Sequence, residues 1–179
     1  MKKKDIRKDN PLSIIGGMNF SDIRIKDDNL REKAEIKMKT GFKIGIESRF
    51  GPFIAGTAFD QRGSRYEIWN YLDMHDTYNY FSFYGLVSYP VMKRLRIFSG
   101  VEAGDCISRR VKIEDESQDV PSVNINWDYG IKAGADVMIF KTIGLRASYY
   151  HGLNDVFEYT DIVPDCKNRS VELSLIYKL

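Results

Sequence analysis

Residues 41–50 read GFKIGIESRF, and apolar side chains alternate with polar or small ones through this stretch. Phe42, Ile44 and Ile46 fall on one face of an extended chain, because successive side chains of a strand point to opposite sides. Lys43 and Glu47 fall on the other face. Residues 170–179, SVELSLIYKL, show the same alternation. The pattern is typical of β-strands with one apolar and one polar face.

Eight runs of this kind follow a polar, basic segment at residues 1–11. We expect strands at residues 12–25, 36–50, 53–69, 78–89, 95–109, 123–139, 143–155 and 168–179. Short turns (51–52, 90–94, 140–142) alternate with long polar connections (26–35, 70–77, 110–122, 156–167). An antiparallel meander places the two kinds of connection at opposite ends, with both termini beside the short turns. The chain is therefore predicted to be all-β, an eight-stranded antiparallel up-and-down β-barrel over residues 12–179.

Composition excludes several classes of protein. The 27 Lys and Arg nearly balance the 25 Asp and Glu, which argues against a nucleic-acid-binding protein with a concentrated basic face. Residues 77–92, the longest stretch without a charge, contain Asn79 and Pro90 and are shorter than the ~20 apolar residues of a membrane helix. The 11 Tyr, 10 Phe and 2 Trp argue against a disordered chain.

The polar face carries charges of both signs in equal number. These residues are Lys43, Glu47, Arg49, Asp60, Arg62, Glu102, Asp128, Lys132, Asp136, Arg146, Glu172 and Lys178. In a soluble sandwich such a face is solvated. In a membrane barrel it lines a narrow lumen, where opposite charges must pair.

Three observations favour the membrane barrel. The polar face is rich in glycine, which relieves crowding inside a small barrel. The runs are long enough for tilted membrane strands of 9–11 residues. The aromatics of the apolar face form two bands, as expected at two lipid interfaces. The expected interfacial aromatics are Phe42, Phe50, Phe53, Phe59, Phe81, Tyr89, Trp127, Tyr129, Tyr149 and Tyr177. We therefore predict a transmembrane barrel with apolar side chains outside and charges inside.

Several segments resemble the PorT-like small outer-membrane β-barrel domain family of Gram-negative bacteria: IGGMNFS (15–21), GFKIG (41–45), QRG (61–63), LRASYYHGL (145–153) and KNRSVELSLIYKL (167–179). The resemblance implies a barrel with periplasmic turns, extracellular loops and a terminal strand read by the outer-membrane assembly machinery. Leu179 stands where the family more often has Phe. A signal peptide is absent from the sequence, and we take it as removed. Residues 1–11 would then form a flexible periplasmic tail. The resemblance implies no activity.

Chemistry-bearing residues are few. His151 is expected at the lipid side of the seventh run, where some small barrels carry a Ser–His pair, but residue 153 is Leu and we interpret His151 as interfacial. We expect no catalytic residue, cofactor or metal site. Cys106 and Cys166 are both placed at the long-loop end, where they could form a disulfide. Asp105 breaks the apolar phase of the fifth run, so either the strand has left the membrane there or a bulge shifts its register.

The interior charges could form an ion path or a plug. An eight-stranded barrel is just wide enough for side chains to fill it, which favours a plug without appreciable conductance. The leading hypothesis is a monomeric, non-enzymatic outer-membrane barrel with a structural or surface-interaction role. Outer-membrane lipids and the assembly machinery are its expected partners, along with an unknown extracellular protein or glycan met by the loops. The alternatives are a lipid-modifying enzyme and a soluble lipocalin-like barrel.

Overall fold

The computed structural model describes residues 12–25, 34–68, 72–113, 116–120, 127–155 and 166–179. The strands are β1 (Leu12–Ile25), β2 (Ala34–Phe50), β3 (Phe53–Ile68), β4 (Leu72–Pro90), β5 (Leu95–Ile113), β6 (Glu116–Val120), β7 (Asp128–Met138), β8 (Ile143–Gly152) and β9 (Cys166–Lys178). Within these ranges no helix is long and apolar enough to cross a bilayer. The expected tail, residues 1–11, lies outside the described residues.

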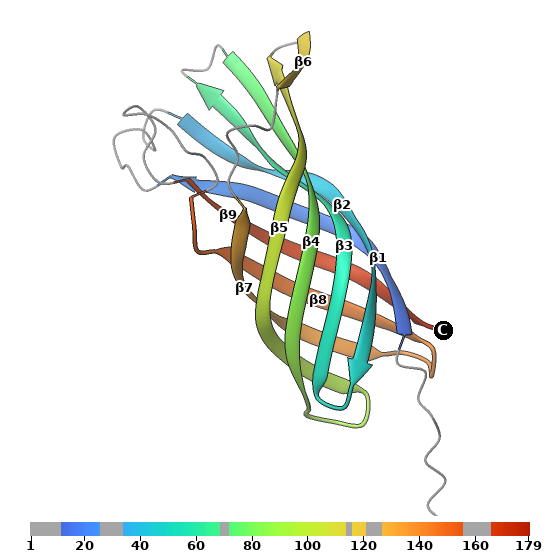
Figure 1. Cartoon of the computed structure of the whole chain (residues 1–179). Coiled ribbons are helices and arrows are strands. Elements are labelled where there is room, and N and C mark those ends of the chain that lie inside the picture. The colour runs from blue at the N-terminus through green and yellow to red at the C-terminus, as the bar shows by residue number, and fades with distance from the viewer. Residues whose placement is uncertain (1–11, 26–33, 69–71, 114–115, 121–126, 156–165) are drawn as a thin grey trace, which may run out of the picture.

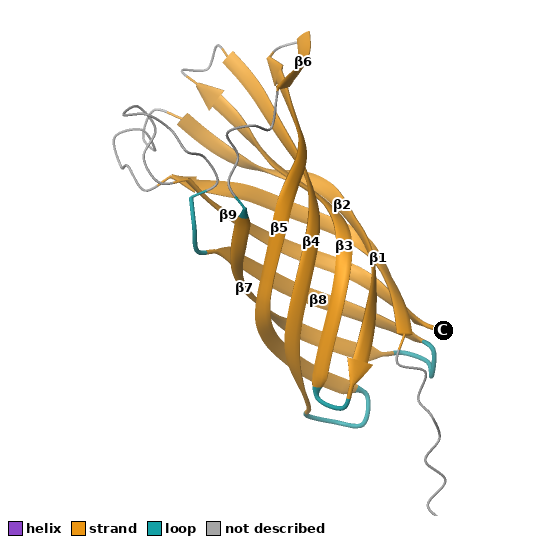
Figure 2. Ribbon diagram, viewed as in Figure 1, coloured by secondary structure: helices purple, strands orange, loops and turns teal. Residues whose placement is uncertain are grey.

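Every pairing between strands is antiparallel, and sequential neighbours pair in the barrel wall (Figures 1 and 2). β1 pairs with β9 as well as with β2, so the sheet closes on itself. The short strand β6 pairs with the end of β5 and projects beyond the wall. The remaining strands form the eight-stranded up-and-down barrel, which confirms the predicted fold class. Closure leaves no strand edge exposed to lipid, as a bilayer requires.

At the long-loop end β4 and β5 continue further than the sequence pattern predicted, whereas β7 begins only at Asp128 and β8 already ends at Gly152, short of the predicted runs 123–139 and 143–155. Residues 72–77, expected in a loop, extend β4, and their ladder to β3 runs up to Ile68 opposite Leu72. The connection after residue 109 was also wrongly predicted: β5 continues to Ile113 and folds back as β6. Outside the bilayer both faces of a sheet are wet, so these segments lack the apolar alternation on which the prediction depended.

The two faces of the wall have opposite environments. Phe42, Leu145 and Leu173 point outward with 47%, 49% and 53% of their surface exposed. Glu47 and Lys132 point inward and are 3% and 1% exposed. An apolar outer wall around a charged interior suits a lipid environment. It contradicts the lipocalin-like alternative, which needs an apolar binding cavity inside and a polar surface outside.

The interior is not polar along its whole length, although the sequence pattern indicated only charged and small residues on the inward face. Near the short turns it contains an apolar cluster that includes Ile15, Ile54, Leu86, Phe98 and Ile176. These side chains alternate with outward apolar residues, so both faces of the strands are apolar there. Burial away from water stabilises this end of the barrel by the hydrophobic effect.

Asp105 remains on the outward face, opposite Phe81 on β4. The register of β4 and β5 shifts just beyond it, from Tyr80 opposite Cys106 to Asn79 opposite Ser108. Ile107 is therefore the extra residue of a β-bulge. Because the bulge follows Asp105, it does not turn that carboxylate inward. Asp105 marks the height at which the outer wall becomes polar.

Candidate functional site

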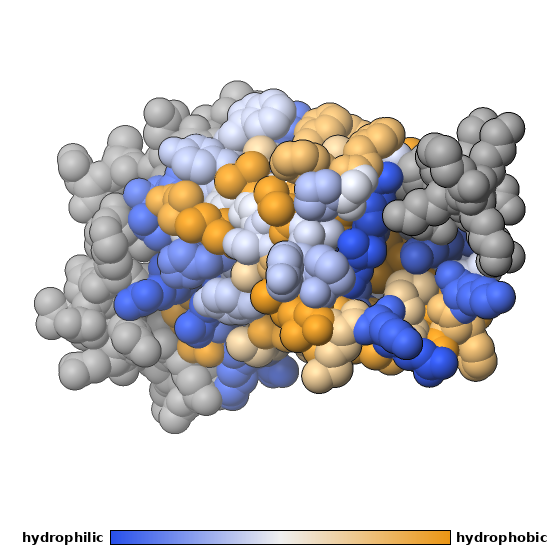
Figure 3. Space-filling view, turned by 90° about the horizontal axis from the view of Figure 1, so that it is seen from below, coloured by the Kyte–Doolittle hydropathy of each residue, from blue (hydrophilic) through white to orange (hydrophobic). Residues whose placement is uncertain are grey.

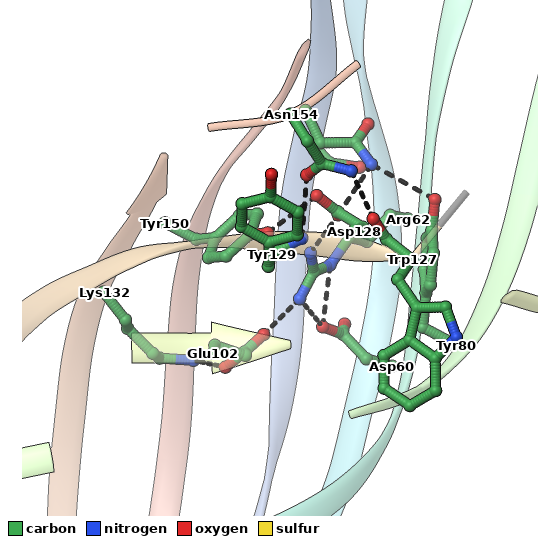
Figure 4. Close-up of polar contacts among 12 residues, drawn as sticks. Asp60, Arg62, Tyr80, Glu102, Trp127, Asp128, Tyr129, Lys132, Tyr150 and Asn154 are labelled. Atoms are coloured by element: carbon green, nitrogen blue, oxygen red, sulfur yellow. Dashed lines mark hydrogen bonds and ion pairs between the residues drawn. The ribbon is translucent and has the colours of Figure 1, made fainter. Parts of the chain in front are cut away.

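The centre of the lumen is organised around the Arg62 guanidinium (Figure 4). Its Nη2 lies 2.6 Å from Asp60 Oδ2 and also contacts Glu102, while its Nη1 lies 2.7 Å from Asp128 Oδ2. The Tyr150 ring centroid is 4.2 Å from the Arg62 Cζ, which gives a cation–π contact on one face. These residues come from β3, β5, β7 and β8, so a single side chain joins strands around the barrel.

Two lysines complete this central cluster. Lys43 Nζ lies 3.0 Å from Glu102 and 3.2 Å from Glu172. Lys132 Nζ lies 2.9 Å from Glu102 and also contacts Glu172. The charged side chains of the cluster are at most 2% exposed. Buried charges of this kind are tolerated because each is paired and hydrogen-bonded.

A second cluster lies between the central one and the short turns. Arg146 Nη1 lies 2.6 Å from Glu47, and Arg146 Nε lies 2.7 Å from Asp136. Asp136 also accepts a bond from Arg49 at 2.9 Å. The Arg146 guanidinium stands 4.8 Å from the ring centroid of Phe98, which belongs to the apolar cluster below. The charged layer and the apolar layer are therefore in contact at the short-turn end of the lumen.

Lys178 is the one predicted lumen charge that the structure places elsewhere. It is partly exposed and lines a pocket at the short-turn end beside Lys93 and Lys141. Lys178 lies at the end of β9, where the wall opens to solvent, so the alternation that placed it on the polar face no longer implies enclosure. The eleven other predicted charges all take part in the salt bridges of the two clusters.

Neutral hydrogen-bond donors complete the network. Asn19 Nδ2 donates to Asp60 at 2.7 Å, and Tyr150 Oη donates to Asp128 at 2.7 Å. Asn168 Nδ2 donates to Asp128 at 2.8 Å. Tyr84 Oη donates to Glu47 at 3.1 Å. Each donor stabilises a carboxylate that is removed from water, which lowers the cost of its burial.

The interior tyrosines of β4 were not predicted from the sequence. Tyr78, Tyr80 and Tyr84 are nearly or fully buried inside, while Phe81 and Phe83 alternate with them on the lipid side. Both faces of β4 are aromatic, so the outward phase expected for Phe81 did not single out the tyrosines opposite as parts of a polar interior. The phenolic hydroxyl groups could have indicated the inward face, because a buried Tyr generally needs a hydrogen-bond partner and the polar lumen offers one.

Two ion pairs nearer the long-loop end were also missed. Asp76 on β4 lies 3.1 Å from Arg109 on β5 and accepts a 2.7 Å bond from Tyr78. Asp22 on β1 pairs with Arg169, the residue directly opposite it on β9. Asp76 fell in a predicted loop, which removed it from consideration. The pairing of Asp22 with Arg169 depends on the register between β1 and β9, and the sequence alone does not give that register.

Asp60, Glu102 and Glu172 place carboxylate oxygens within 4.8 Å of one another, a spacing that a metal ion could use. Lys43 contacts all three of these carboxylates, and Lys132 contacts both glutamates. The ammonium groups thus already neutralise the oxygens that would act as ligands. The donor set is that of an ion-pair cluster and does not fit a metal centre.

Nine of the ten predicted interfacial aromatics lie on the outward face of the strands, and Trp127 directly precedes β7. Towards the short turns, Phe50, Phe53, Tyr89 and Tyr177 are 51–69% exposed. Towards the long-loop end, Phe42 stacks on Phe59 with ring centroids 5.5 Å apart. The other members there are Phe81, Trp127, Tyr129 and Tyr149, each exposed by 41–53%.

The possible disulfide between Cys106 and Cys166 is not seen at Cys106, the one of the two cysteines whose side chain is described. Cys106 is a free, buried cysteine whose thiol donates to the Ser108 carbonyl at 3.5 Å. Its strand, β5, is separated from β9, which begins at Cys166, by β7 and β8. The side chain of Cys166 lies outside the described residues. Placement at the same end of a barrel was therefore not enough to bring the two cysteines together.

His151 has a structural environment. Its partners in the β-ladder are Ile131 and Arg169, and its ring lies 6.3 Å from that of Tyr149 in a stacked arrangement. None of these neighbours is the serine that a Ser–His pair requires. The contacts are those of an interfacial histidine next to an aromatic residue.

A family model described as an outer membrane protein beta-barrel domain matches residues 11–158. Among solved structures, Neisserial surface protein A has a TM-score of 0.62 at 10% identity, covering 94% of this chain and 97% of that one. Ail, the attachment invasion locus protein of Yersinia pestis, has a TM-score of 0.52 at 14% identity, covering 93% and 96%. The outer membrane protein AlkL has a TM-score of 0.53 at 16% identity, covering 100% and 98%. At these identities the likeness is one of fold. No curated protein sequence matches the chain.

Proposed function

Because the chain belongs to the outer membrane protein β-barrel domain family, we propose that it is a non-enzymatic outer-membrane barrel with a closed lumen that acts through its surface-exposed end. The observation that carries the closed lumen is the stacking of the Arg62 cluster, the Arg146 cluster and the apolar layer. An eight-stranded barrel is just wide enough for side chains of this kind to fill it.

A surface-interaction role is supported by the part of the wall beyond the upper aromatic band. On the outward face, the row after Phe59 and Phe81 consists of Gln61, Asn79 and Ser108. Gln61 donates to Asn79 at 3.1 Å, and Asn79 donates to Ser108 at 2.8 Å. This polar row belongs in water. β4 continues beyond it from Asn79 to Leu72, about 20 Å of strand, and so offers a firm platform to a partner.

The finer assignments are parts of the same proposal. The sequence segments quoted above favour the PorT-like group within the family. The alternating apolar residues of β9 suit recognition by the outer-membrane assembly machinery. Residues 1–11 would be a periplasmic tail. A monomer is expected because the barrel closes without help from a second chain. The lipid-modifying alternative is not proposed, since the neighbours of His151 give it no support.

The closed lumen is tested by single-channel recording in planar lipid bilayers. We expect the wild-type protein to give no stable openings, while an open porin in the same bilayers serves as the positive control. Insertion is verified independently by heat-modifiable migration of protein recovered from the lipid. Stable, reproducible conductance steps from inserted protein would contradict the proposal.

A further inference from the structure

We propose that the short-turn end of the barrel binds the anionic headgroup of a phospholipid of the periplasmic leaflet. The site is a pocket of about 430 Å³ between the turns at residues 91–94 and 139–142. The inference rests on the proposed function for its orientation, because an outer-membrane barrel directs its short turns to the periplasm.

The pocket is lined by cations without any acidic residue. Its charged residues are Lys93, Arg94, Lys141 and Lys178. Lys178 already interacts with another group of the protein. Lys93, Arg94 and Lys141 form no ion pair within the described residues. The neighbouring segments 48–54, 88–97 and 137–145 contain no Asp or Glu. Positive charge that no acidic side chain compensates attracts an anion, and basic pockets at a membrane surface are suited to lipid headgroups.

The rest of the pocket lining is apolar. Ile139 and Phe140 are 42% and 66% exposed, and the half-buried Met138 adjoins them from the inward side of β7. Viewed from the turn end, hydrophilic and hydrophobic residues lie next to each other on this face (Figure 3). A phospholipid has the same division, with a charged phosphate beside the start of its acyl chains. A free phosphate would have no use for the apolar side, so the lining favours the lipid.

Backbone hydrogen bonds fix the walls of the pocket. Met138 N donates to the Arg94 carbonyl at 2.8 Å and joins the two turns. Lys178 N donates to the Thr142 carbonyl at 2.8 Å and joins the second turn to β9. The three segments that carry the cations are therefore positioned before a ligand arrives, which reduces the ordering cost of binding.

The experiment compares K93Q/R94Q/K141Q with a matched variant, R24Q/R110Q/K112Q, which loses the same charge at the other end. Each protein is placed in nanodiscs with equal phosphatidylglycerol and phosphatidylcholine, and retained lipids are counted by native mass spectrometry. We expect the wild type and the matched variant to retain phosphatidylglycerol preferentially. In the turn variant, the preference for phosphatidylglycerol over phosphatidylcholine should fall by at least about tenfold. Each cation near an anionic surface strengthens binding by about fivefold, and this variant lacks three of them.

Three outcomes would overturn the inference: an unchanged preference in the turn variant, an equal loss in the matched variant, or displacement of the lipid by millimolar inorganic phosphate. Orientation is checked separately in intact cells with a membrane-impermeant maleimide, in a background without Cys106 and Cys166. Labelling of Ser117→Cys but not Lys141→Cys supports the proposed function. The reverse labelling would refute the proposed orientation itself, whereas correct labelling without a lipid preference would refute the inference alone.

Discussion

Replacing Arg62 by Met should destabilise the barrel more than any surface change. Met retains much of the length of the side chain but removes the charge between Asp60, Glu102 and Asp128. Asp60 keeps Lys43 at 3.5 Å, and Glu102 keeps both lysines. Within the described residues, Arg62 is the only cation in a salt bridge with Asp128.

The size of the effect follows from that asymmetry. Removing one partner of a buried ion pair costs about 3–5 kcal/mol, because the other charge stays buried without compensation. With a denaturant dependence of about 2 kcal/mol per molar urea, the unfolding midpoint in lipid vesicles should fall by about 2 M. Tryptophan fluorescence follows the transition, because Trp127 directly precedes β7 and its surroundings change when the barrel unfolds.

Two comparisons isolate the cause. Arg24→Met, at the exposed end of β1, should change stability by less than about 0.5 kcal/mol. The double variant Arg62→Met/Asp128→Asn should recover about 1–3 kcal/mol, since the uncompensated carboxylate is gone. A midpoint for Arg62→Met close to that of the wild type, or strictly additive effects in the double variant, would refute the view that the cluster holds fully ionised, mutually dependent charges.

Two further predictions concern the wall. Leu173→Arg places a charge on the lipid-facing side of β9, where Leu173 lies opposite Met18 and Ala147, and should cost about 2–4 kcal/mol in urea unfolding from vesicles; wild-type stability would mean that this face does not meet lipid. Gly100→Ala should lower the free energy of unfolding by about 1–3 kcal/mol, because a Cβ there would lie 2.1 Å from the Gly85 carbonyl oxygen. In Gly85→Ala the new Cβ points into open space, so stability should change by less than about 0.5 kcal/mol. Equal urea midpoints for the two variants would contradict this packing.

The sequence alone determined which side of the wall is apolar. In GFKIGIESRF and SVELSLIYKL the alternation is regular, because a barrel between lipid and a charged lumen demands opposite chemistry on the two faces. The balance of inward charges also followed from composition and phase, since a narrow interior cannot hold a large excess of one sign. These features depend on the order of residues within each strand, so they can be predicted from each strand separately.

The tertiary structure decided what depends on how strands meet. The partners of Arg62 come from β3, β5 and β7, and their contact is set by register and by closure of the barrel. Cys106 and Cys166 lie on strands that closure keeps apart. Phe81 was expected outside, but the enclosure of Tyr80 beside Asn168 of β9 depends on how distant strands meet. The alternation of side chains along a strand determines which face of the wall each residue occupies. It does not determine which residues of other strands it contacts across the lumen, because those contacts form only when β9 pairs with β1 and the barrel closes.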